Sequence, residues 1–548
     1  MKTSLALFLC LLLTILMSVK GVCQNYDVSF DAILRTQLST ESPGGTALVA
    51  KNGKVIYRRS FGKANLELDV TMNPDHVFRI GSITKQFTAS AILRLAEEDK
   101  LSLSDTITRF ITDYPMGRHA ITVEHLLTHT SGIKDYTSLS RFNAETKGKN
   151  FTPKELIDLF KDEPMDFPPG TDYRYSNSGY ILLGYIIELI SGKLYAEYIN
   201  ENFFQPLGMK NSSYDNASAI VRNRASGYKK KNGHFENSDY LSMTLPYSAG
   251  SILSQVDDLF LWYDAIMNNS VLHKESLEKA HTSYKLSDGK LTGYGYGWEL
   301  GNIQGSPTIK HVGRINGFVT YSVYLPIEKI FVAIFTNCEC TDNLENPASR
   351  MAAIILEKPY QWSKIELSPK ILEFYPGVYK SAYGGKKIIG YEDGRLLYFS
   401  KGGSKSTLIP FEKDKFVLEN SLTTLEFQRN SAGDIISYNL KGTGMSIMWN
   451  RFAGEIKTLK VINVAEKTLE KYIGNYQFSP GPVFSIVKEG KKLYGQVGQD
   501  KKEILPYETN KFFAKEIDAK IIFNFDKSGK VISLTKVQSD EMNAKKVE

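Results

Sequence analysis

Cysteine and long apolar runs are both scarce in this chain of 548 residues, and each scarcity excludes a class of protein. There are four cysteines, and two of them, Cys10 and Cys23, lie within the first 23 residues. The other two, Cys338 and Cys340, are two positions apart near a predicted strand end, where a disulfide across one residue is expected to be strained. A disulfide framework is therefore excluded, and the fold must be held by hydrophobic cores.

The one long apolar run lies at the N-terminus. Residues 5–17 are almost entirely apolar and follow the positively charged Lys2. The run is shorter than the roughly 20 apolar residues that a membrane-spanning helix needs, and no other stretch approaches that length. This predicts a signal peptide over residues 1–23 and export to the periplasm or the extracellular space. The alternatives are a transmembrane anchor, or lipid attachment at Cys23, which Val22 disfavours because a lipobox has a small residue there.

Neither charge sign dominates the chain. It has 67 basic and 60 acidic residues and a formal net charge of +7, with no basic block or stripe. No nucleic-acid partner is therefore expected. The length predicts two to four domains, and the 31 tyrosines and 29 phenylalanines favour β-rich structure.

Strands are predicted at both ends of the first 360 residues, with helices between them. The strand patterns lie at residues 45–60, 308–312, 318–325 and 330–336. The first is a hairpin, because Asn52 and Gly53 favour a tight turn between two strands. Helical patterns fill the region between about residues 82 and 282. We therefore expect an α+β fold in which one antiparallel sheet is closed by the two chain ends and a helical lobe is inserted.

The rest of the chain contains an internal repeat. Residues 372–379 match residues 469–476, and residues 408–416 match residues 504–512 in nearly the same register. Each copy consists of short alternating strands separated by Gly, Asp and Asn, which predicts two small all-β domains of barrel or sandwich type. The predicted domains are a signal peptide (1–23), a catalytic domain (24–361) and two β-barrel-like repeats (362–456 and 457–548).

The candidate nucleophile is Ser82. A serine hydroxyl is weak at neutral pH and needs an adjacent base. Lys85 follows three positions later, so both side chains lie on one face at the start of a predicted helix. The helix N-terminus also presents free N–H groups where an oxyanion would form. Other pairs, such as Ser276 and Lys279, have the same spacing, so the position after the hairpin is what favours Ser82.

Two further segments carry candidate site residues. Tyr175 and Asn177 lie in a polar loop between predicted helices, and a tyrosine beside a lysine cation ionises more easily and can shuttle protons. The alternative interpretation is a surface loop rich in tyrosine. His311 and Gly313 end a predicted strand, with Arg314 next in the chain. The glycine allows close approach of the backbone to a ligand. A single histidine in a strand is otherwise more often structural.

These motifs together resemble those of one family. Ser82-x-x-Lys85, Tyr175-x-Asn177 and His311-x-Gly313, in this order, are similar to the three motifs of the class C β-lactamase family. That family includes penicillin-binding carboxypeptidases, D-aminopeptidases and esterases. Residues 126–132 resemble the segment that follows the nucleophile helix, and the resemblance covers roughly residues 30–355. The C-terminal repeats more weakly resemble the barrels of D-aminopeptidase-like members.

The resemblance implies a β-lactamase/transpeptidase-like fold and a role for each residue. Ser82 would be the acyl acceptor, and Lys85 and Tyr175 would share the general base and acid roles. The backbone N–H groups of Ser82 and Arg314 would form the oxyanion hole, and Asn177 would bind the acyl-side amide. No cofactor or metal is implied, and the expected partner is a small-molecule or peptide substrate, such as one derived from the cell wall.

The third motif departs from the family pattern. Members that bind a substrate carboxylate usually have lysine where this chain has His311. Neutral imidazole is a poorer carboxylate partner than an ammonium group. We therefore expect a secreted serine hydrolase that acts on esters or small peptides and amides, with β-lactamase or D-Ala-D-Ala carboxypeptidase activity as the alternative.

The sequence allows two other interpretations. His125 and His129 have the spacing of helical metal ligands, but no glutamate follows His125 as the zinc-protease motif requires. We expect them to pack against the turn after the helix. The chain could also be a non-catalytic cell-wall or penicillin-binding protein. A pure binder has no need of Lys85 and Tyr175, and this argues against it.

Overall fold

The computed structural model describes residues 26–547, except 116–118, 232, 342, 382–384, 443–445, 453–458, 479–482, 499 and 539–540. The predicted signal peptide over residues 1–23, with Cys23, lies outside the described residues. No single helix among those described is long and apolar enough to cross a membrane, although the bent pair Asn177–Ser191 and Tyr195–Leu207 passes by length and composition.

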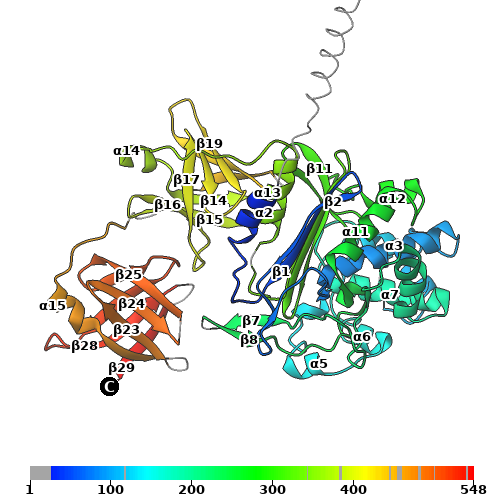
Figure 1. Cartoon of the computed structure of the whole chain (residues 1–548). Helices are drawn as coiled ribbons and strands as arrows, with labels where there is room; N and C mark the ends of the chain where they lie inside the picture. Colours follow the sequence, from blue (N-terminus) through cyan, green and yellow to red (C-terminus); the bar gives the residue numbers. More distant parts are fainter. Residues whose placement is uncertain are drawn as a thin grey trace, which may run out of the picture.

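A six-stranded antiparallel sheet forms the centre of the catalytic region (Figure 1). Its strands, in spatial order, are β10 (Glu299–Ile303), β11 (Ser306–Ile315), β12 (Phe318–Leu325), β13 (Ile330–Thr336), β1 (Gly45–Lys51) and β2 (Lys54–Phe61). The two chain ends close the sheet as predicted, because β1 pairs with β13 along its whole length. Asn52 and Gly53 both have positive φ and form the tight turn between β1 and β2.

Each face of the sheet packs on its own core. Leu48 and Ala50 of β1 face the helical lobe, while Ala47 and Val49 face the opposite side, as expected from the alternation of side chains along a strand. Figure 1 shows the lobe on one face and two terminal helices on the other. The lobe helices α3 (Thr84–Glu97), α7 (Asn177–Ser191) and α11 (Val256–Met267) are the longest on their side. The terminal helices are α2 (Asp27–Leu34) and α13 (Glu345–Ile355).

Shorter elements complete this region. The helices are α4 (Val123–Leu127), α5 (Ala144–Gly148), α6 (Pro153–Asp158), α8 (Tyr195–Ile199), α9 (Gln205–Leu207), α10 (Tyr247–Gly250) and α12 (Lys274–Ala280). Single turns are η1 (Gly81–Ile83), η2 (Ile107–Arg109), η3 (Tyr136–Ser138) and η4 (Asn200–Phe204). Small strands are β3 (Lys63–Asn65), β4 (Val70–Thr71), β5 (Phe78–Arg79), β6 (Ser213–Tyr214), β7 (Tyr228–Lys231), β8 (His234–Asn237) and β9 (Ile252–Ser254).

Two closed barrels follow, so the predicted fold class is confirmed. The first consists of β14 (Gly377–Ser381), β15 (Lys386–Glu392), β16 (Arg395–Phe399), β17 (Ser406–Glu412), β18 (Lys415–Leu418), β19 (Thr424–Arg429), β20 (Ile435–Lys441) and β21 (Ser446–Phe452). The second consists of β22 (Gly474–Phe478), β23 (Val483–Glu489), β24 (Lys492–Val497), β25 (Asp500–Glu508), β26 (Lys511–Ala514), β27 (Lys520–Phe525), β28 (Val531–Val537) and β29 (Glu541–Val547). Helix α14 (Pro369–Leu372) precedes the first barrel. Helix α15 (Glu466–Leu469) and the turn η5 (Glu470–Tyr472) precede the second barrel.

The sequence repeat corresponds to a structural one. The register shifts after Pro410 in the first barrel and after Pro506 in the second. In the first barrel, the hydroxyl of Tyr379 donates a hydrogen bond of 2.8 Å to the carbonyl oxygen of Tyr375, four residues earlier. In the second barrel, Tyr476 makes the equivalent bond to Tyr472. Buried aromatic side chains fill both interiors, as is usual for eight-stranded barrels.

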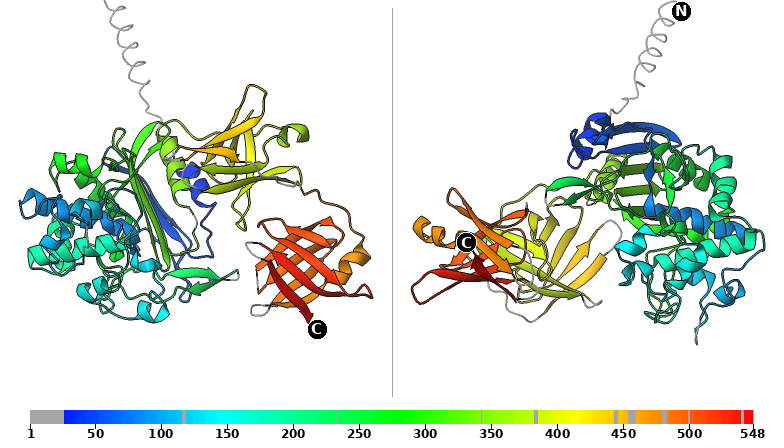
Figure 2. Two further views of the ribbon diagram at one scale, coloured as in Figure 1. Left: turned by 180° about the vertical axis from the view of Figure 1, so that it is seen from behind. Right: turned by 90° about the horizontal axis from the view of Figure 1, so that it is seen from below.

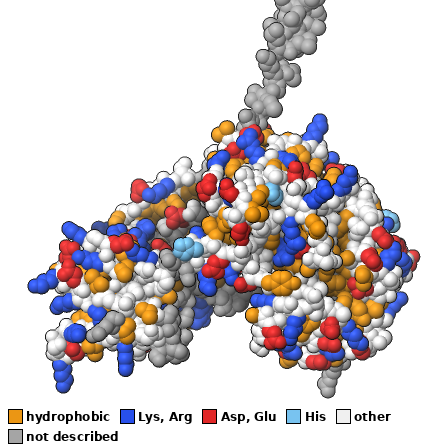
Figure 3. All heavy atoms as spheres, turned by 60° about the horizontal axis from the view of Figure 1, so that its bottom comes forward, with side chains coloured by type: hydrophobic (Ala, Val, Ile, Leu, Met, Phe, Trp, Pro, Cys, Tyr) orange, Lys and Arg blue, Asp and Glu red, His pale blue; other side chains and the backbone are white. Residues whose placement is uncertain are grey.

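The barrels contact each other and the catalytic region. Figure 2 shows both on one side of the catalytic sheet. Lys405 is buried between them, 2.7 Å from Glu392 and 3.0 Å from the carbonyl oxygen of Ala514. Asn346 of α13 donates to the carbonyl oxygen of Asn420 in the first barrel at 2.6 Å. Acidic and basic side chains are interspersed on the face shown in Figure 3.

The two cysteines outside the N-terminal segment are bonded to each other. The structure joins Cys338 and Cys340 in a disulfide. Strand β13 ends at Thr336, as predicted, so both cysteines lie just past the strand end. The two residues lie in the turn that follows, with their Cα atoms 5.0 Å apart, and this geometry brings the sulfur atoms together.

Candidate active site

Ser82 lies in the turn η1, directly before helix α3, and its side chain is half-buried. Gly81 before it has a φ of +51°, and a Cβ there would lie 2.9 Å from the backbone nitrogen of Arg314. Only glycine fits this position without strain. The turn therefore holds Ser82 against the end of β11, as an oxyanion hole built from the N–H groups of Ser82 and Arg314 requires.

Lys85 is fully buried one turn into the helix region, and its Nζ lies 3.2 Å from Ser82 Oγ. The Nζ is also 2.8 Å from Asn177 Oδ1 and 2.9 Å from the carbonyl oxygen of Ala249. Burial lowers the pKa of Lys85 to about 7, and the charge of Asp135 opposes this shift. A large fraction of Lys85 is therefore neutral near pH 7, as a general base must be.

Tyr175 lies beside these groups, but not in the way expected. Lys85 Nζ is 4.7 Å from the centre of the Tyr175 ring, so the cation faces the ring rather than the phenol oxygen. The hydroxyl is buried and makes no hydrogen bond of normal length with the described residues. Burial raises the pKa of Tyr175 well above its ordinary value, although the nearby Ser82 hydroxyl acts in the other direction. The expectation that this tyrosine ionises more easily is wrong, because burial raises its pKa more than the Ser82 hydroxyl lowers it.

Asn177 begins helix α7 and connects Lys85 to an acidic residue that sequence reasoning missed. Its Oδ1 accepts from Lys85, and its Nδ2 donates to Asp135 Oδ2 at 3.1 Å. One N–H of the amide is then left for a ligand, which suits the predicted contact with an acyl-side amide. Asp135 lies three residues after the segment 126–132, and that proximity was the only signal for it in the sequence.

His311 lies on β11 and is 1% exposed. Its Nε2 is 2.9 Å from the hydroxyl oxygen of Tyr294, and its Nδ1 is 2.7 Å from the carbonyl oxygen of Val312. Burial, reinforced by the charge of Lys85, lowers the pKa of His311 to about 3. The imidazole is therefore neutral at physiological pH, as the sequence argument assumed.

Gly313 and Arg314 complete the third motif. A Cβ at Gly313 would lie 2.0 Å from the carbonyl oxygen of Ile80, so a side chain there would push β11 away from the nucleophile turn. The guanidinium group of Arg314 donates to the carbonyl oxygen of Thr341 at 3.2 Å. The backbone of Arg314 thus faces Gly81, while its side chain contacts the turn that follows β13.

His129 is a second residue whose place near the site was not anticipated. It is buried, its ring centre lies 4.2 Å from that of Tyr175, and its Nδ1 accepts from the backbone N–H of Ser176 at 3.1 Å. His125 instead forms a capping box with Thr122 at the start of α4. In the part of the chain that the structure describes, no three His, Cys, Asp or Glu side chains are grouped to hold a metal ion.

The fold thus brings the three predicted motifs to one place, with a serine, a buried lysine and a neutral tyrosine in contact. The comparisons define the class. The Beta-lactamase family model matches residues 30–354, and the chain belongs to this family of serine hydrolases, as the motifs predicted. Residues 459–547, within the second barrel region, match a domain of unknown function, DUF3471.

Three similar proteins show how far the likeness extends. Penicillin-binding protein 4* of Bacillus subtilis is 28% identical over 431 residues, which cover 74% of this chain and 94% of that protein. The solved structure of the octameric penicillin-binding protein homologue from Pyrococcus abyssi is 29% identical with a TM-score of 0.54, over 78% of this chain and 99% of that one. D-amino acid amidase from Ochrobactrum anthropi SV3 shares the fold at 23% identity and a TM-score of 0.53, over 61% of this chain and 99% of that one.

Proposed function

We propose that the chain is an exported hydrolase that is acylated at Ser82 and releases the acyl group to water. The observation that carries this proposal is the pair formed by Ser82 and Lys85: their side-chain oxygen and nitrogen are 3.2 Å apart, and burial lowers the pKa of the lysine to about 7. A neutral amine at this distance is a suitable base for a serine hydroxyl.

In the proposed first step, Lys85 takes the Ser82 proton while Oγ attacks the substrate carbonyl carbon. The carbonyl oxygen becomes negative and is stabilised by the backbone N–H groups of Ser82 and Arg314. Tyr175, whose hydroxyl is protonated at rest, then supplies a proton to the leaving alcohol or amine, and the proton taken up by Lys85 replaces it. In the second step, water attacks the acyl-serine, and the same two residues transfer the protons. The lowered pKa of Lys85 suits a base, and the raised pKa of Tyr175 suits an acid.

The proposed substrate is an ester, or a small peptide or amide, without a carboxylate next to the scissile bond. His311 is neutral, and its Nε2 is already bonded to Tyr294. The cations on either side are also engaged, because Lys310 is paired with Glu345 and Arg314 contacts Thr341. The third motif therefore offers no cation committed to a substrate carboxylate.

A second candidate is hydrolysis of β-lactams or D-Ala-D-Ala peptides, which the names of the penicillin-binding relatives favour. A non-catalytic penicillin or cell-wall binder is the third. Incubating the full chain with a nitrophenyl ester, a D-Ala-D-Ala peptide and a cephalosporin separates the three. We expect fastest turnover of the ester. Faster turnover of the cephalosporin or the D-Ala-D-Ala peptide would favour the second candidate, and an absence of turnover would favour the third.

A further inference from the structure

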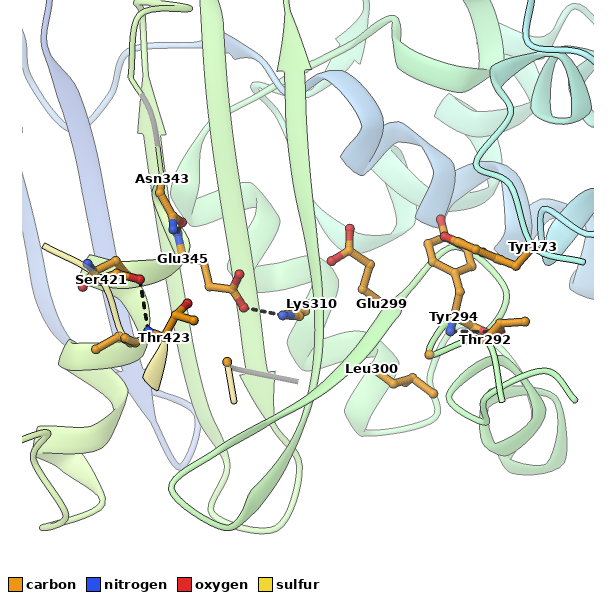
Figure 4. Close-up of a pocket in the computed structure, with 14 residues that line it drawn as sticks. Tyr173, Thr292, Tyr294, Glu299, Leu300, Lys310, Asn343, Glu345, Ser421 and Thr423 are labelled. Carbon is orange, nitrogen blue, oxygen red and sulfur yellow. Dashed lines mark hydrogen bonds and ion pairs between the residues drawn. The ribbon is translucent and has the colours of Figure 1, made fainter. Parts of the chain in front are cut away.

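A cavity lies where the edge of the catalytic sheet meets the first barrel (Figure 4). It has a volume of about 390 Å³, which is within the range of small-ligand sites. Tyr173, Tyr294 and Glu299 line it from the catalytic side. Ser421, Leu422 and Thr423 line it from the turn between β18 and β19 of the barrel. The barrel therefore supplies one wall of a site that the catalytic domain alone does not enclose.

One carboxylate in this cavity, that of Glu299, has no hydrogen bond or ion pair with the described residues. Lys310 and Glu345 form an ion pair, drawn as a dashed line in Figure 4. Glu299 stands opposite Lys310 in the strand pair β10–β11, yet its carboxylate makes no ion pair or hydrogen bond with any described residue. Burial raises the pKa of Glu299, and Lys310 opposes the shift. A half-buried carboxylate that makes no hydrogen bond or close ion pair is unfavourable, and a bound cation would relieve this.

The other lining groups suit a cation on an apolar chain. The rings of Tyr173 and Tyr294 lie 6.1 Å apart between their centres and both border the cavity. Aromatic faces attract ammonium groups. Leu300 and Leu422 provide apolar contact for a methylene chain, while the hydroxyl of Thr423 can accept a hydrogen bond from an ammonium group.

Two lining residues connect the cavity to the active site. Tyr294 lines it and bonds His311 through its hydroxyl, at 2.9 Å. Tyr173 is two residues before Tyr175 in the same loop. The wall of the cavity is therefore in contact with the third motif through Tyr294.

We propose that this cavity binds the ammonium group of a basic side chain carried by the substrate, with Glu299 as its counter-ion and the first barrel as its outer wall. The inference rests on the proposed function, because it assumes a substrate that is hydrolysed at Ser82. It assigns to the appended barrel a role in substrate selection.

A binding measurement tests the cavity without depending on turnover. Full-length Ser82→Ala protein is titrated with n-pentylamine and with n-pentanol at pH 8 in a calorimeter. We expect the amine to bind more tightly than the alcohol, and Glu299→Gln in the same background to weaken the amine by about 10- to 100-fold, as for the loss of a charge-assisted hydrogen bond. Glu236→Gln on the exposed strand β8 is the matched control and should bind the amine as tightly as its parent.

A second variant guards against a folding artefact. Thr423→Lys introduces a cation from the barrel side and should abolish amine binding while Glu299 is intact. Equal binding of amine and alcohol, or retention of amine affinity in both Glu299→Gln and Thr423→Lys, would overturn the proposal. So would failure of the parent protein to bind n-pentylamine at millimolar concentration.

A kinetic measurement on the Ser82-containing chain tests the link to substrate. Two short peptide esters are compared that differ only in a lysine side chain beside the scissile bond, free in one and acetylated in the other. We expect kcat/KM to favour the free lysine, and Glu299→Gln to reduce this preference by about tenfold or more. Equal rates on both esters would refute the substrate assignment. Absence of any turnover would refute the proposed function. The amine titration of Ser82→Ala would still test whether the cavity binds an ammonium group.

Discussion

The hydroxyl oxygen of Tyr294 lies 2.9 Å from Nε2 of His311, and both side chains are buried. This contact gives the histidine of the third motif a fixed partner inside the protein. Since burial also lowers the pKa of His311 to about 3, the side chain carries no charge in the working pH range. Because His311 is neutral, it does not favour substrates that carry a carboxylate.

Replacing His311 with lysine should shift the enzyme toward substrates that carry a carboxylate. An ammonium group here can form a charge-assisted hydrogen bond, and the ratio of kcat/KM between a D-Ala-D-Ala peptide and a nitrophenyl ester should rise by about 10- to 100-fold. His273→Lys, on the surface, is the matched control and should leave the ratio unchanged. If the native enzyme already prefers a cephalosporin or the peptide, His311 does not set the substrate preference, and the Arg314 side chain becomes the candidate carboxylate partner.

Activity on a neutral ester should increase as the pH rises through about 7. The base form of Lys85 is the unprotonated amine, and burial lowers its pKa to about 7, so the active fraction is small at pH 5 and nearly complete at pH 9. The high pKa of Tyr175 keeps its proton in place throughout this range. The measurement is kcat/KM against pH. A profile that is flat from pH 5 to 9, or that falls through pH 7, would exclude Lys85 as the base.

A chain that ends after Gln361 should fold and unfold cooperatively. The sheet is closed by β13 and β1, and both of its faces pack on cores from residues before 361. The barrels have separate aromatic cores. Far- and near-ultraviolet circular dichroism with thermal melting checks this. An insoluble product, or one without a cooperative melt, would show that the first barrel completes the catalytic core.

The mature protein should begin between about residues 19 and 26 when it is recovered from the exporting cell. The reason is the charged Lys2 followed by the apolar run of residues 5–17. N-terminal sequencing of secreted or periplasmic protein makes the measurement. Intact Met1 on protein recovered from the cytoplasm would contradict export.

Local patterns predicted the parts of the fold that depend on neighbouring residues. Asn52 and Gly53 form the predicted turn, and Ser82 and Lys85 meet because they are three positions apart at a helix start. The pairing of β1 with β13 also followed from the order of strands and helices.

Other features depend on contacts between distant segments and left no short pattern. Asp135 reaches Asn177 only after α7 packs beside it, and Tyr294 reaches His311 from a separate loop. The ionisation of Tyr175 was mispredicted because spacing places Lys85 nearby but does not say which part of the phenol it faces. The bond between Cys338 and Cys340 did not follow from the sequence, because the residues after the strand carry no pattern that gives the geometry of their turn.

The central claim is that Ser82 accepts the acyl group with Lys85 as its base. Intact-mass measurement of the full chain after brief exposure to an activated ester and to a serine-directed phosphonate tests it most directly. We expect one adduct, located on the peptide that contains Ser82, and none on folded Ser82→Ala. Lys85→Ala should form it slower by orders of magnitude, and Ser276→Ala, which alters another serine three positions before a lysine, should match the native chain. Equal labelling of Ser82→Ala would contradict the account and assign the chemistry to another serine.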